Sequence, residues 1–378
     1  MFYYLLPPLD ELSPLFNVFR YISFRSLMAM LTAFLFSLYL YPAFVAWLKK
    51  KQYGQSNIRA DVPSQHLKKS GTPTMGGLMI IFSILFSLFL WSDGSNIILL
   101  GAVFVFVSFG LLGMADDVQK FIPNPKGQKD RTTAHRGRGL SGRSRLICGA
   151  IIALCSFVFI YYNADNSTAL QLNLPFFKNM ALPLGWLFLL VVVFVIVGSS
   201  NAVNLTDGLD GLAIGPILVV AGVFGVISYL SGNKNYAEYL QINHVANSGE
   251  LAVFCAAIIG AGLGFLWFNA PPAMVFMGDT GSLALGGVLG YMALATKHEI
   301  VLGIAGFLFV VEALSVMLQV GYFKYSKIKY KAGRRIFLMA PLHHHYEKKG
   351  LAETHIVIRF WIIASICAVL ALSTLKLR

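Results

Sequence analysis

Long apolar segments separated by short polar stretches run along the whole chain. Their apolar residues are continuous and do not alternate with polar ones, which favours membrane helices over the strands of a membrane β-barrel. A helix needs roughly 17–25 apolar residues to cross the hydrocarbon core. The pattern therefore predicts an all-α integral membrane protein, a bundle of about ten transmembrane helices. The ten segments cover residues 27–48, 74–91, 97–115, 146–162, 182–198, 212–230, 251–268, 282–296, 300–323 and 356–375.

The positive charges predict how this bundle is oriented. The loops after the first, third, fifth, seventh and ninth segments contain 22 Lys and Arg residues, whereas the four loops between them contain only Lys178, Lys234 and Lys297. Because cytoplasmic loops carry an excess of Lys and Arg, we expect the first set in the cytoplasm and both termini on the periplasmic side. No loop is long enough for a second soluble domain, so residues 1–378 are expected to form a single polytopic membrane domain. The polar, basic segment 126–138 is predicted to be a mobile insertion.

Composition agrees with a lipid environment. Hydrophobic residues make up 57% of the chain and charged residues 12%, about half the charged share of a soluble domain. The net charge of +13 would suit a nucleic-acid partner, but the charges lie in loops between apolar segments. We therefore expect the lipid bilayer as a partner and no nucleic acid.

Five of the few acidic residues lie where an apolar segment meets a predicted cytoplasmic loop. Ionisable groups at the membrane boundary are costly unless compensated, and they usually mark a functional site. Carboxylate oxygens in a shared cleft suit Mg²⁺, which takes a few carboxylates together with water and substrate phosphates. The pattern therefore indicates a polar, Mg²⁺-binding cleft on one membrane face. The five residues are Asp116 and Asp117 in GMADD, Asp207 and Asp210 in NLTDGLDG, and Asp279 in MGDTGS.

Each of these features also has a simpler interpretation. Asp116 could cap a helix end or reach water, and Asp279, followed by Thr280 and Ser282, could be an N-cap. Lys69 and the GTPTMGG turn after it could bind diphosphate through the ammonium and backbone N–H groups, or be ordinary loop chemistry.

The PLHHHYE loop and the ninth segment add further candidates. His343, His344 and His345 lack the spacing of a zinc site, so phosphate binding or proton transfer fits them better than metal binding. Glu312 and Gln319 lie seven residues apart and share one helix face, so both are expected to point into the cleft; Glu312 could instead be a satisfied interior acid.

Five stretches of the sequence resemble, in order, the polyprenyl-phosphate N-acetylhexosamine-1-phosphate transferase superfamily. The similarity is greatest to its bacterial cell-wall branch, the phospho-N-acetylmuramoyl-pentapeptide transferases (translocase I). Two departures are a longer loop between Lys120 and Arg145 and an arginine at 145 where a lysine is expected. The five stretches are GTPTMGG at 71–77, DD at 116–117, NAVNLTDGLDGLA at 201–213, FNAPPAMVFMGDTGSLALGG at 268–287 and MAPLHHHYE at 339–347.

The resemblance implies a reaction. UDP-N-acetylmuramoyl-pentapeptide and undecaprenyl phosphate would give lipid I and UMP with Mg²⁺ in the inner membrane, as the first membrane step of peptidoglycan synthesis. It implies catalytic roles for Asp116, Asp117, Asp279 and His343, and metal binding by Asp279, Asp116 and Asp117, with Asp279 the direct ligand. It leaves a homodimer possible. The substrate-binding residues that it implies are Lys69, Thr74, Asn204, Asp207, Asp210, Asn269, Phe276, Gln319, His344 and His345.

Two other functions compete with this one. A related transferase could move N-acetylglucosamine phosphate to the polyprenyl carrier, although the MAPLHHHYE loop favours the muramoyl-peptide branch. A transporter could also place acids in a ten-helix bundle, but transporters place them near the bilayer midplane. Because the acids here are all predicted at one face, an enzyme is favoured.

Overall fold

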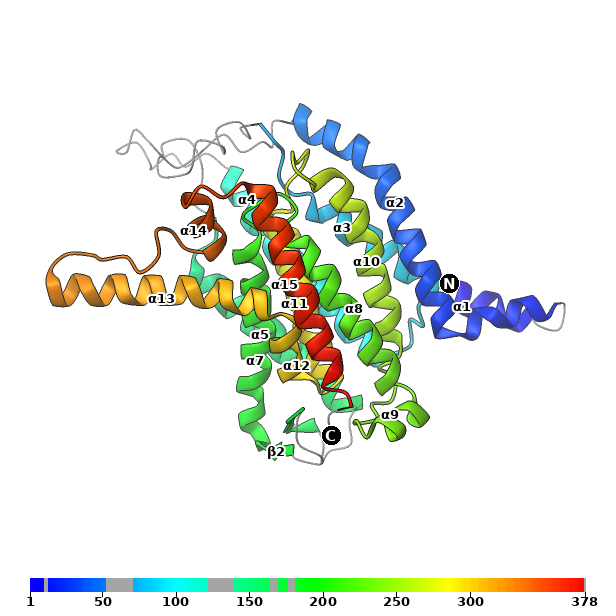
Figure 1. The fold of residues 1–378 in the computed structure, drawn as a ribbon. Helices are drawn as coiled ribbons and strands as arrows, with labels where there is room; N and C mark the ends of the chain where they lie inside the picture. Colours follow the sequence, from blue (N-terminus) through cyan, green and yellow to red (C-terminus); the bar gives the residue numbers. More distant parts are fainter. Residues whose placement is uncertain (10–12, 52–70, 122–138, 164–168, 176–180, 377–378) are drawn as a thin grey trace.

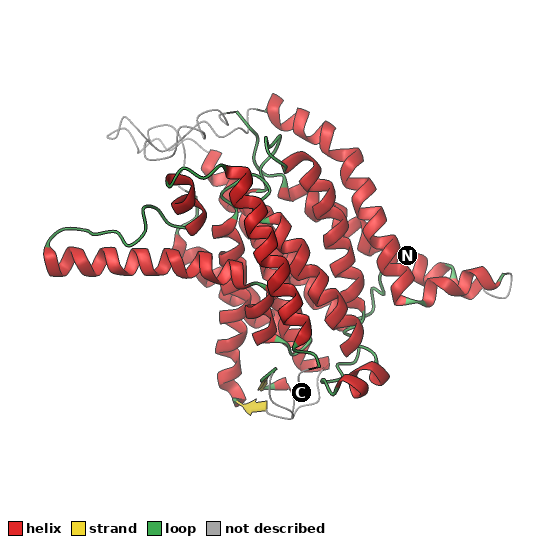
Figure 2. Cartoon of the chain, in the orientation of Figure 1, coloured by secondary structure: helices red, strands yellow, loops and turns green. Residues whose placement is uncertain are grey.

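Helices form nearly all of the regular structure. The computed structural model describes all residues except 10–12, 52–70, 122–138, 164–168, 176–180 and 377–378. Figure 1 shows one bundle of long helices, and Figure 2 shows how little strand the described part contains. The prediction of an all-α fold is confirmed. The helices are α1 (Phe2–Leu5), α2 (Ile22–Lys50), α3 (Gly77–Trp91), α4 (Ile97–Phe121), α5 (Gly142–Asn163), α7 (Phe188–Thr206), α8 (Ile214–Ser231), α9 (Lys234–Leu240), α10 (Glu250–Asn269), α11 (Gly278–Ala295), α12 (Glu299–Ala305), α13 (Phe307–Tyr330), α14 (Leu342–Lys348) and α15 (Glu353–Ser373).

The membrane character of the bundle is confirmed. Among the described residues, 8 helices are long and apolar enough to cross a bilayer, namely α2, α4, α5, α7, α8, α10, α13 and α15. Helix α3 is apolar but only 15 residues long, and α11 is rich in glycine. Each of the ten predicted segments overlaps one of these ten helices, and the number that crosses the membrane stays a prediction.

Two predicted segments differ from the structure. The segment 300–323 is divided at Gly306, where the backbone (φ −93°, ψ 20°) leaves the helical conformation between α12 and α13. Helix α13 then runs sideways out of the bundle (Figure 1). The segment 182–198 is α-helical only from Phe188, because residues 181–183 form strand β2 (Ala181–Pro183), which pairs antiparallel with β1 (Gln171–Asn173). A 3₁₀ turn over Gly185–Leu187 lies between the strand and α7. A proline followed closely by a glycine explains the delayed helix start.

Helix α11 lies at the centre of the bundle, and every residue from Thr280 to Ala295 is buried. Glycines allow its neighbours to approach closely. A Cβ atom at Gly77 of α3 would lie 2.2 Å from the backbone nitrogen of Gly281, and one at Gly113 of α4 would lie 2.2 Å from a carbonyl oxygen of α11. Small residues at such crossings permit van der Waals packing within a bilayer. This packing brings the end of α4 against the start of α11.

Both chain termini lie at the other end of the bundle. The terminal ammonium of Met1 donates to the carbonyl of Phe89 near the end of α3, and Lys376 donates to the carbonyl of Tyr239 in α9. A buried ion pair between Arg25 and Glu250, 2.6 Å apart, holds α2 against α10 at this end. Both termini are thus separated from the acidic turns by the length of the helices.

Candidate active site

Three carboxylates from two helices surround one ammonium group. Asp116 and Asp117 lie in the last turns of α4, and Asp279 lies in the first turn of α11. The Nζ atom of Lys120 is 2.7 Å from Asp116, 2.9 Å from Asp279 and 3.7 Å from Asp117. Asp116 and Asp117 are buried, and buried like charges require a compensating cation. Lys120, one helical turn after Asp116, supplies that charge.

Asp117 caps the start of α11. Its carboxylate accepts hydrogen bonds from the backbone N–H groups of Asp279 (3.2 Å) and Thr280 (2.9 Å) and from the Thr280 hydroxyl (2.7 Å). The simpler interpretation of Asp279 as an N-cap is therefore wrong, because a neighbouring helix supplies the capping carboxylate. Gly278 has a positive φ of 75°. A Cβ atom there would lie 2.8 Å from the Asp117 carboxylate and 2.9 Å from the Thr74 hydroxyl, so Thr74 adjoins this centre.

The Asp279 carboxylate is held from three directions. The Asn204 amide, from the last turn of α7, donates to Oδ1 (2.9 Å) and also to the Ser282 hydroxyl (2.9 Å). Lys120 (2.9 Å) and Arg145 (3.4 Å) both contact Oδ2. Asn204, predicted to bind substrate, therefore orients an acid in this structure. The arginine that replaces the expected lysine reaches the same carboxylate.

Asp207 ends α7 and stands in a strongly negative environment. Its backbone N–H donates to the Asn204 carbonyl, which closes the helix. Burial raises the pKa of Asp207 to about 7, and the negative charges of nearby aspartates act in the same direction. A cation or a hydrogen-bond donor brought by a ligand would lower that pKa again.

Asn269 joins the turn after α7 to the loop before α11. Its side-chain oxygen accepts from the Gly211 N–H (2.9 Å), and its amide donates to the Val275 carbonyl (2.8 Å). Asp210 links the same turn to the same loop, because its carboxylate accepts a hydrogen bond from the Ala273 N–H (3.0 Å). Both side chains are buried. Two residues predicted to bind substrate thus also fix the wall of the site.

The GTPTMGG turn pairs with the same loop. The N–H groups of Gly76 and Gly77 donate to the carbonyls of Phe276 and Met277, each at 2.8 Å. These two donors are therefore not free to bind diphosphate, contrary to one interpretation of the turn. Lys69 lies outside the described residues. The pairing places Phe276 next to the turn that follows Lys69.

The PLHHHYE segment, expected as a loop, forms the short helix α14 and reaches the site through His343. This side chain is fully buried, and its Nδ1 lies 3.2 Å from a carboxylate oxygen of Glu312 in α13. A Cβ atom at Gly208 would lie 2.3 Å from His343 Nε2. Gln319 instead accepts from the N–H groups of residues 336 and 337 (both 3.0 Å). Glu312 and Gln319 thus both hold the segment after α13, and only Glu312 faces a predicted catalytic residue.

The other two histidines have local partners. His344 Nδ1 is 3.0 Å from the Glu347 carboxylate one turn later in α14, and His345 Nδ1 accepts from the Leu338 N–H (3.1 Å). His345 is partly exposed, whereas Glu347 is buried. These contacts hold α14 around His343, and among the described residues neither histidine is hydrogen-bonded to Asp116, Asp117 or Asp279.

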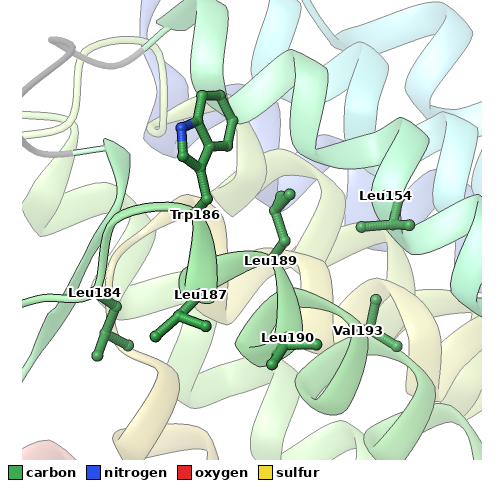
Figure 3. Close-up of a pocket in the computed structure, with 7 residues that line it drawn as sticks. All are labelled: Leu154, Leu184, Trp186, Leu187, Leu189, Leu190 and Val193. Atoms are coloured by element: carbon green, nitrogen blue, oxygen red, sulfur yellow. The ribbon is translucent and has the colours of Figure 1, made fainter.

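The pocket in Figure 3 lies elsewhere. It is formed by apolar side chains of α5, the start of α7 and the turn before α7. Asn204 is at the opposite end of α7, so this pocket is separate from the acidic residues. It offers no group for acid, base or phosphate chemistry. Its lining residues are Leu154, Leu184, Trp186, Leu187, Leu189, Leu190 and Val193.

The last turn of α7 and the segment between α7 and α8 connect three clusters: Asn204 reaches Asp279, Gly208 reaches His343 and Gly211 reaches Asn269. The structure thus brings together most of the predicted residues, with Gln319 on α13 and His344 and His345 on α14 beside them. Sequence reasoning missed Lys120, whose signal was its position four residues after Asp116. It also missed Glu353, which accepts from the Asp210 N–H (2.9 Å) and has no local sequence signal.

Comparison with known proteins gives a consistent result. The family model described as glycosyl transferase family 4 matches residues 97–297, and phospho-N-acetylmuramoyl-pentapeptide-transferase signature 1 matches residues 69–81. The enzyme of that name from Bartonella quintana is 53% identical over 371 residues, covering 98% of each chain. Those from Desulfovibrio desulfuricans and Granulibacter bethesdensis are 50% and 52% identical, each over 100% of both chains. This similarity along the whole chain shows that the chain belongs to the phospho-N-acetylmuramoyl-pentapeptide-transferase family.

Proposed function

We propose that the chain transfers phospho-N-acetylmuramoyl-pentapeptide from UDP-N-acetylmuramoyl-pentapeptide to undecaprenyl phosphate, giving lipid I and UMP. The reaction takes place at the cytoplasmic face of the bacterial inner membrane. The observation that carries the proposal is the identity of about 50% along the whole chain to transferases of that name. The acidic centre at one end of a membrane bundle supports it.

The carboxylate centre fits a magnesium ion. Its oxygen donors are of the kind Mg²⁺ prefers, and the Lys120 ammonium shows that a cation is accommodated among them. No group of three or more His, Cys, Asp or Glu in the described residues encloses a metal site. Mg²⁺ does not require one, because it keeps water and takes substrate phosphates as ligands. Asp279 would hold it, with Asp116 next to it, and Lys120 would move aside.

The chain's own residues suggest a direct transfer. Asp116 takes or orients the proton of the lipid phosphate, whose oxygen bonds to the β-phosphorus while the bond from that phosphorus to UMP breaks. Asp117 keeps the start of α11 in place through its three hydrogen bonds, and Arg145 and Lys120 contribute positive charge beside the diphosphate. Bound Mg²⁺ would neutralise charge on the diphosphate and on the departing UMP.

A two-step path is the alternative mechanism. One aspartate would attack the β-phosphorus, and the lipid phosphate would then displace it from a covalent phospho-sugar intermediate. Asp117 is poorly suited to this attack, because both of its oxygens accept hydrogen bonds from α11.

The function is tested by product analysis with purified protein. We expect formation of UMP and a lipid-linked muramoyl-pentapeptide from UDP-N-acetylmuramoyl-pentapeptide and undecaprenyl phosphate, with Mg²⁺ required. UDP-N-acetylglucosamine in place of the muramoyl nucleotide should give no lipid product. A lipid-linked N-acetylglucosamine would instead favour the alternative transferase, and no product from either donor would contradict both. A homodimer stays a prediction.

The cytoplasmic placement of the site predicts a labelling pattern in intact cells. Cys148 and Cys155 are exposed, so both are first replaced by serine. A cysteine at Asn233, at the end with the chain termini, should react with a membrane-impermeant maleimide. A cysteine at Ala332, after α13, should react only in lysed cells. Both positions are exposed, so burial does not explain a difference. The reverse pattern would overturn the orientation derived from the Lys and Arg residues.

A further inference from the structure

Glu312 and His343 form a buried pair at the edge of the site. Glu312 lies in the second turn of α13 and is 1% exposed, and His343, in α14, is 0% exposed. The carboxylate accepts from the His343 backbone N–H (3.1 Å) at one oxygen and lies 3.2 Å from Nδ1 at the other. Both the backbone and the ring are therefore held by one side chain.

This contact decides which ring nitrogen carries the proton. A carboxylate oxygen acts as the acceptor, so this contact favours the tautomer with the proton on Nδ1. In the neutral ring Nε2 then has a free lone pair. Nε2 is buried and has no hydrogen-bond partner among the described residues. It faces Gly208, where even a methyl group would lie 2.3 Å away.

The neutral form is favoured by the surroundings. Burial lowers the pKa of His343, while the Glu312 hydrogen bond opposes the shift. The charged and titratable groups around the ring are Glu312 from α13 and His344 and Glu347 from α14. Gly208 belongs to the turn that carries Asp207 and Asp210. In a neutral ring that is protonated on Nδ1, Nε2 can accept a hydrogen bond. It cannot donate one to a phosphate oxygen.

We propose that Glu312 is a positioning residue that fixes His343 as a hydrogen-bond acceptor, and that Nε2 accepts from an O–H or N–H donor of the nucleotide sugar bound at the Asp207–Asp210 turn. A buried acceptor without a partner costs free energy in the ligand-free protein. Binding regains that free energy when the ligand supplies the donor and the turn shifts at Gly208. The inference rests on the proposed function for the identity of the ligand.

Glu312→Gln tests the pair with almost no change in shape. The Gln amide would donate to Nδ1 and drive the proton to Nε2, which reverses the ring's polarity. Loss of the correct tautomer in a comparable dyad costs up to about 10⁴-fold in kcat, and here we expect about 10²-fold or more in kcat/KM for the nucleotide sugar. His343→Asn should lose a similar factor, because its amide still reaches Glu312 but nothing replaces Nε2.

Nitrogen NMR of ¹⁵N-histidine-labelled protein in lipid nanodiscs gives a readout that a purely structural role would not move. We assign the His343 signals by their absence in His343→Asn. Wild type should show a proton on Nδ1 and Glu312→Gln a proton on Nε2. Glu347→Gln makes the same substitution in the neighbouring pair with His344 and should leave the His343 tautomer unchanged. A common tautomer in wild type and Glu312→Gln would overturn the inference.

The pH dependence distinguishes acceptor from phosphate-binding cation. If neutral Nε2 accepts from the ligand, affinity for the nucleotide sugar falls as pH drops through the lowered His343 pKa. If an imidazolium held phosphate, affinity would rise instead, and the inference would fail. A wild-type protein that makes no lipid product would contradict the proposed function alone, since the tautomer is measured without substrate.

Discussion

Asp279→Asn should reduce transfer by about 10²–10³-fold or more, a loss typical of removing a main electrostatic stabiliser. The Asp279 carboxylate accepts from Asn204 and contacts both Lys120 and Arg145. An amide at 279 would remove a negative charge and point an N–H₂ group at one of these donors. The site would then lose its proposed metal ligand and also the order of the side chains around it.

Metal binding provides a second measurement for this variant. Titration with Mn²⁺, followed by electron paramagnetic resonance, should show weaker binding to Asp279→Asn than to wild type. Thermal unfolding should show whether the bundle stays folded. Glu238→Gln, an exposed acid-to-amide change in α9 at the opposite end, should leave turnover and Mn²⁺ binding unchanged. Near-normal turnover of Asp279→Asn at limiting Mg²⁺ would show that the ligand assignment is wrong.

Asp116→Asn should lower kcat by roughly 10²–10⁴-fold, the usual range for losing a general base. Its carboxylate accepts from the Leu140 N–H (2.6 Å) and contacts Lys120 at 2.7 Å. Asparagine can keep the first contact but cannot take a proton. Binding of a non-reactive nucleotide analogue should change little, because Asp116 has no contact with the turn that carries Asp207 and Asp210.

The adjacent acid serves as the comparison. Both oxygens of Asp117 accept hydrogen bonds from α11, so Asp117→Asn turns an N–H₂ group toward at least one of these donors, and a buried donor left without a partner costs about 1–3 kcal/mol. We therefore expect a lower melting temperature together with lower activity for Asp117→Asn, and lower activity alone for Asp116→Asn. Steady-state kinetics and thermal unfolding of both variants check this difference. If Asp116→Asn lost analogue binding and kept kcat, Asp116 would belong to the nucleotide pocket.

The sequence by itself determined the lipid environment, the helical fold and the family. Apolar stretches of bilayer length in a chain with 12% charged residues leave a helical bundle as the fold, because backbone groups must pair internally in lipid. The rarity of acids made Asp116, Asp117 and Asp279 conspicuous. The order of the motifs that contain them also indicated the family, because residue type and spacing can be compared directly between sequences.

Local sequence could not supply the relations between these residues. The cap of α11 comes from Asp117, 163 residues away from Thr280, so the short-range N-cap signal at Asp279 pointed to the wrong residue. The break at Gly306 and the sideways course of α13 are also absent from the hydropathy pattern, which is continuous over residues 300–323.

The tertiary structure also decided what Glu312 contacts. As an isolated acid in an apolar segment, Glu312 could line the cleft or be an interior acid with its own hydrogen-bond partners. Helical periodicity places it on the same helix face in either case, so the sequence pattern does not distinguish the two. Only the fold places the ring of His343, 31 residues later in the chain, against the Glu312 carboxylate. Hydrogen bonds between distant segments follow from how helices pack, so the sequence supplied the candidate groups and the fold determined what each one faces.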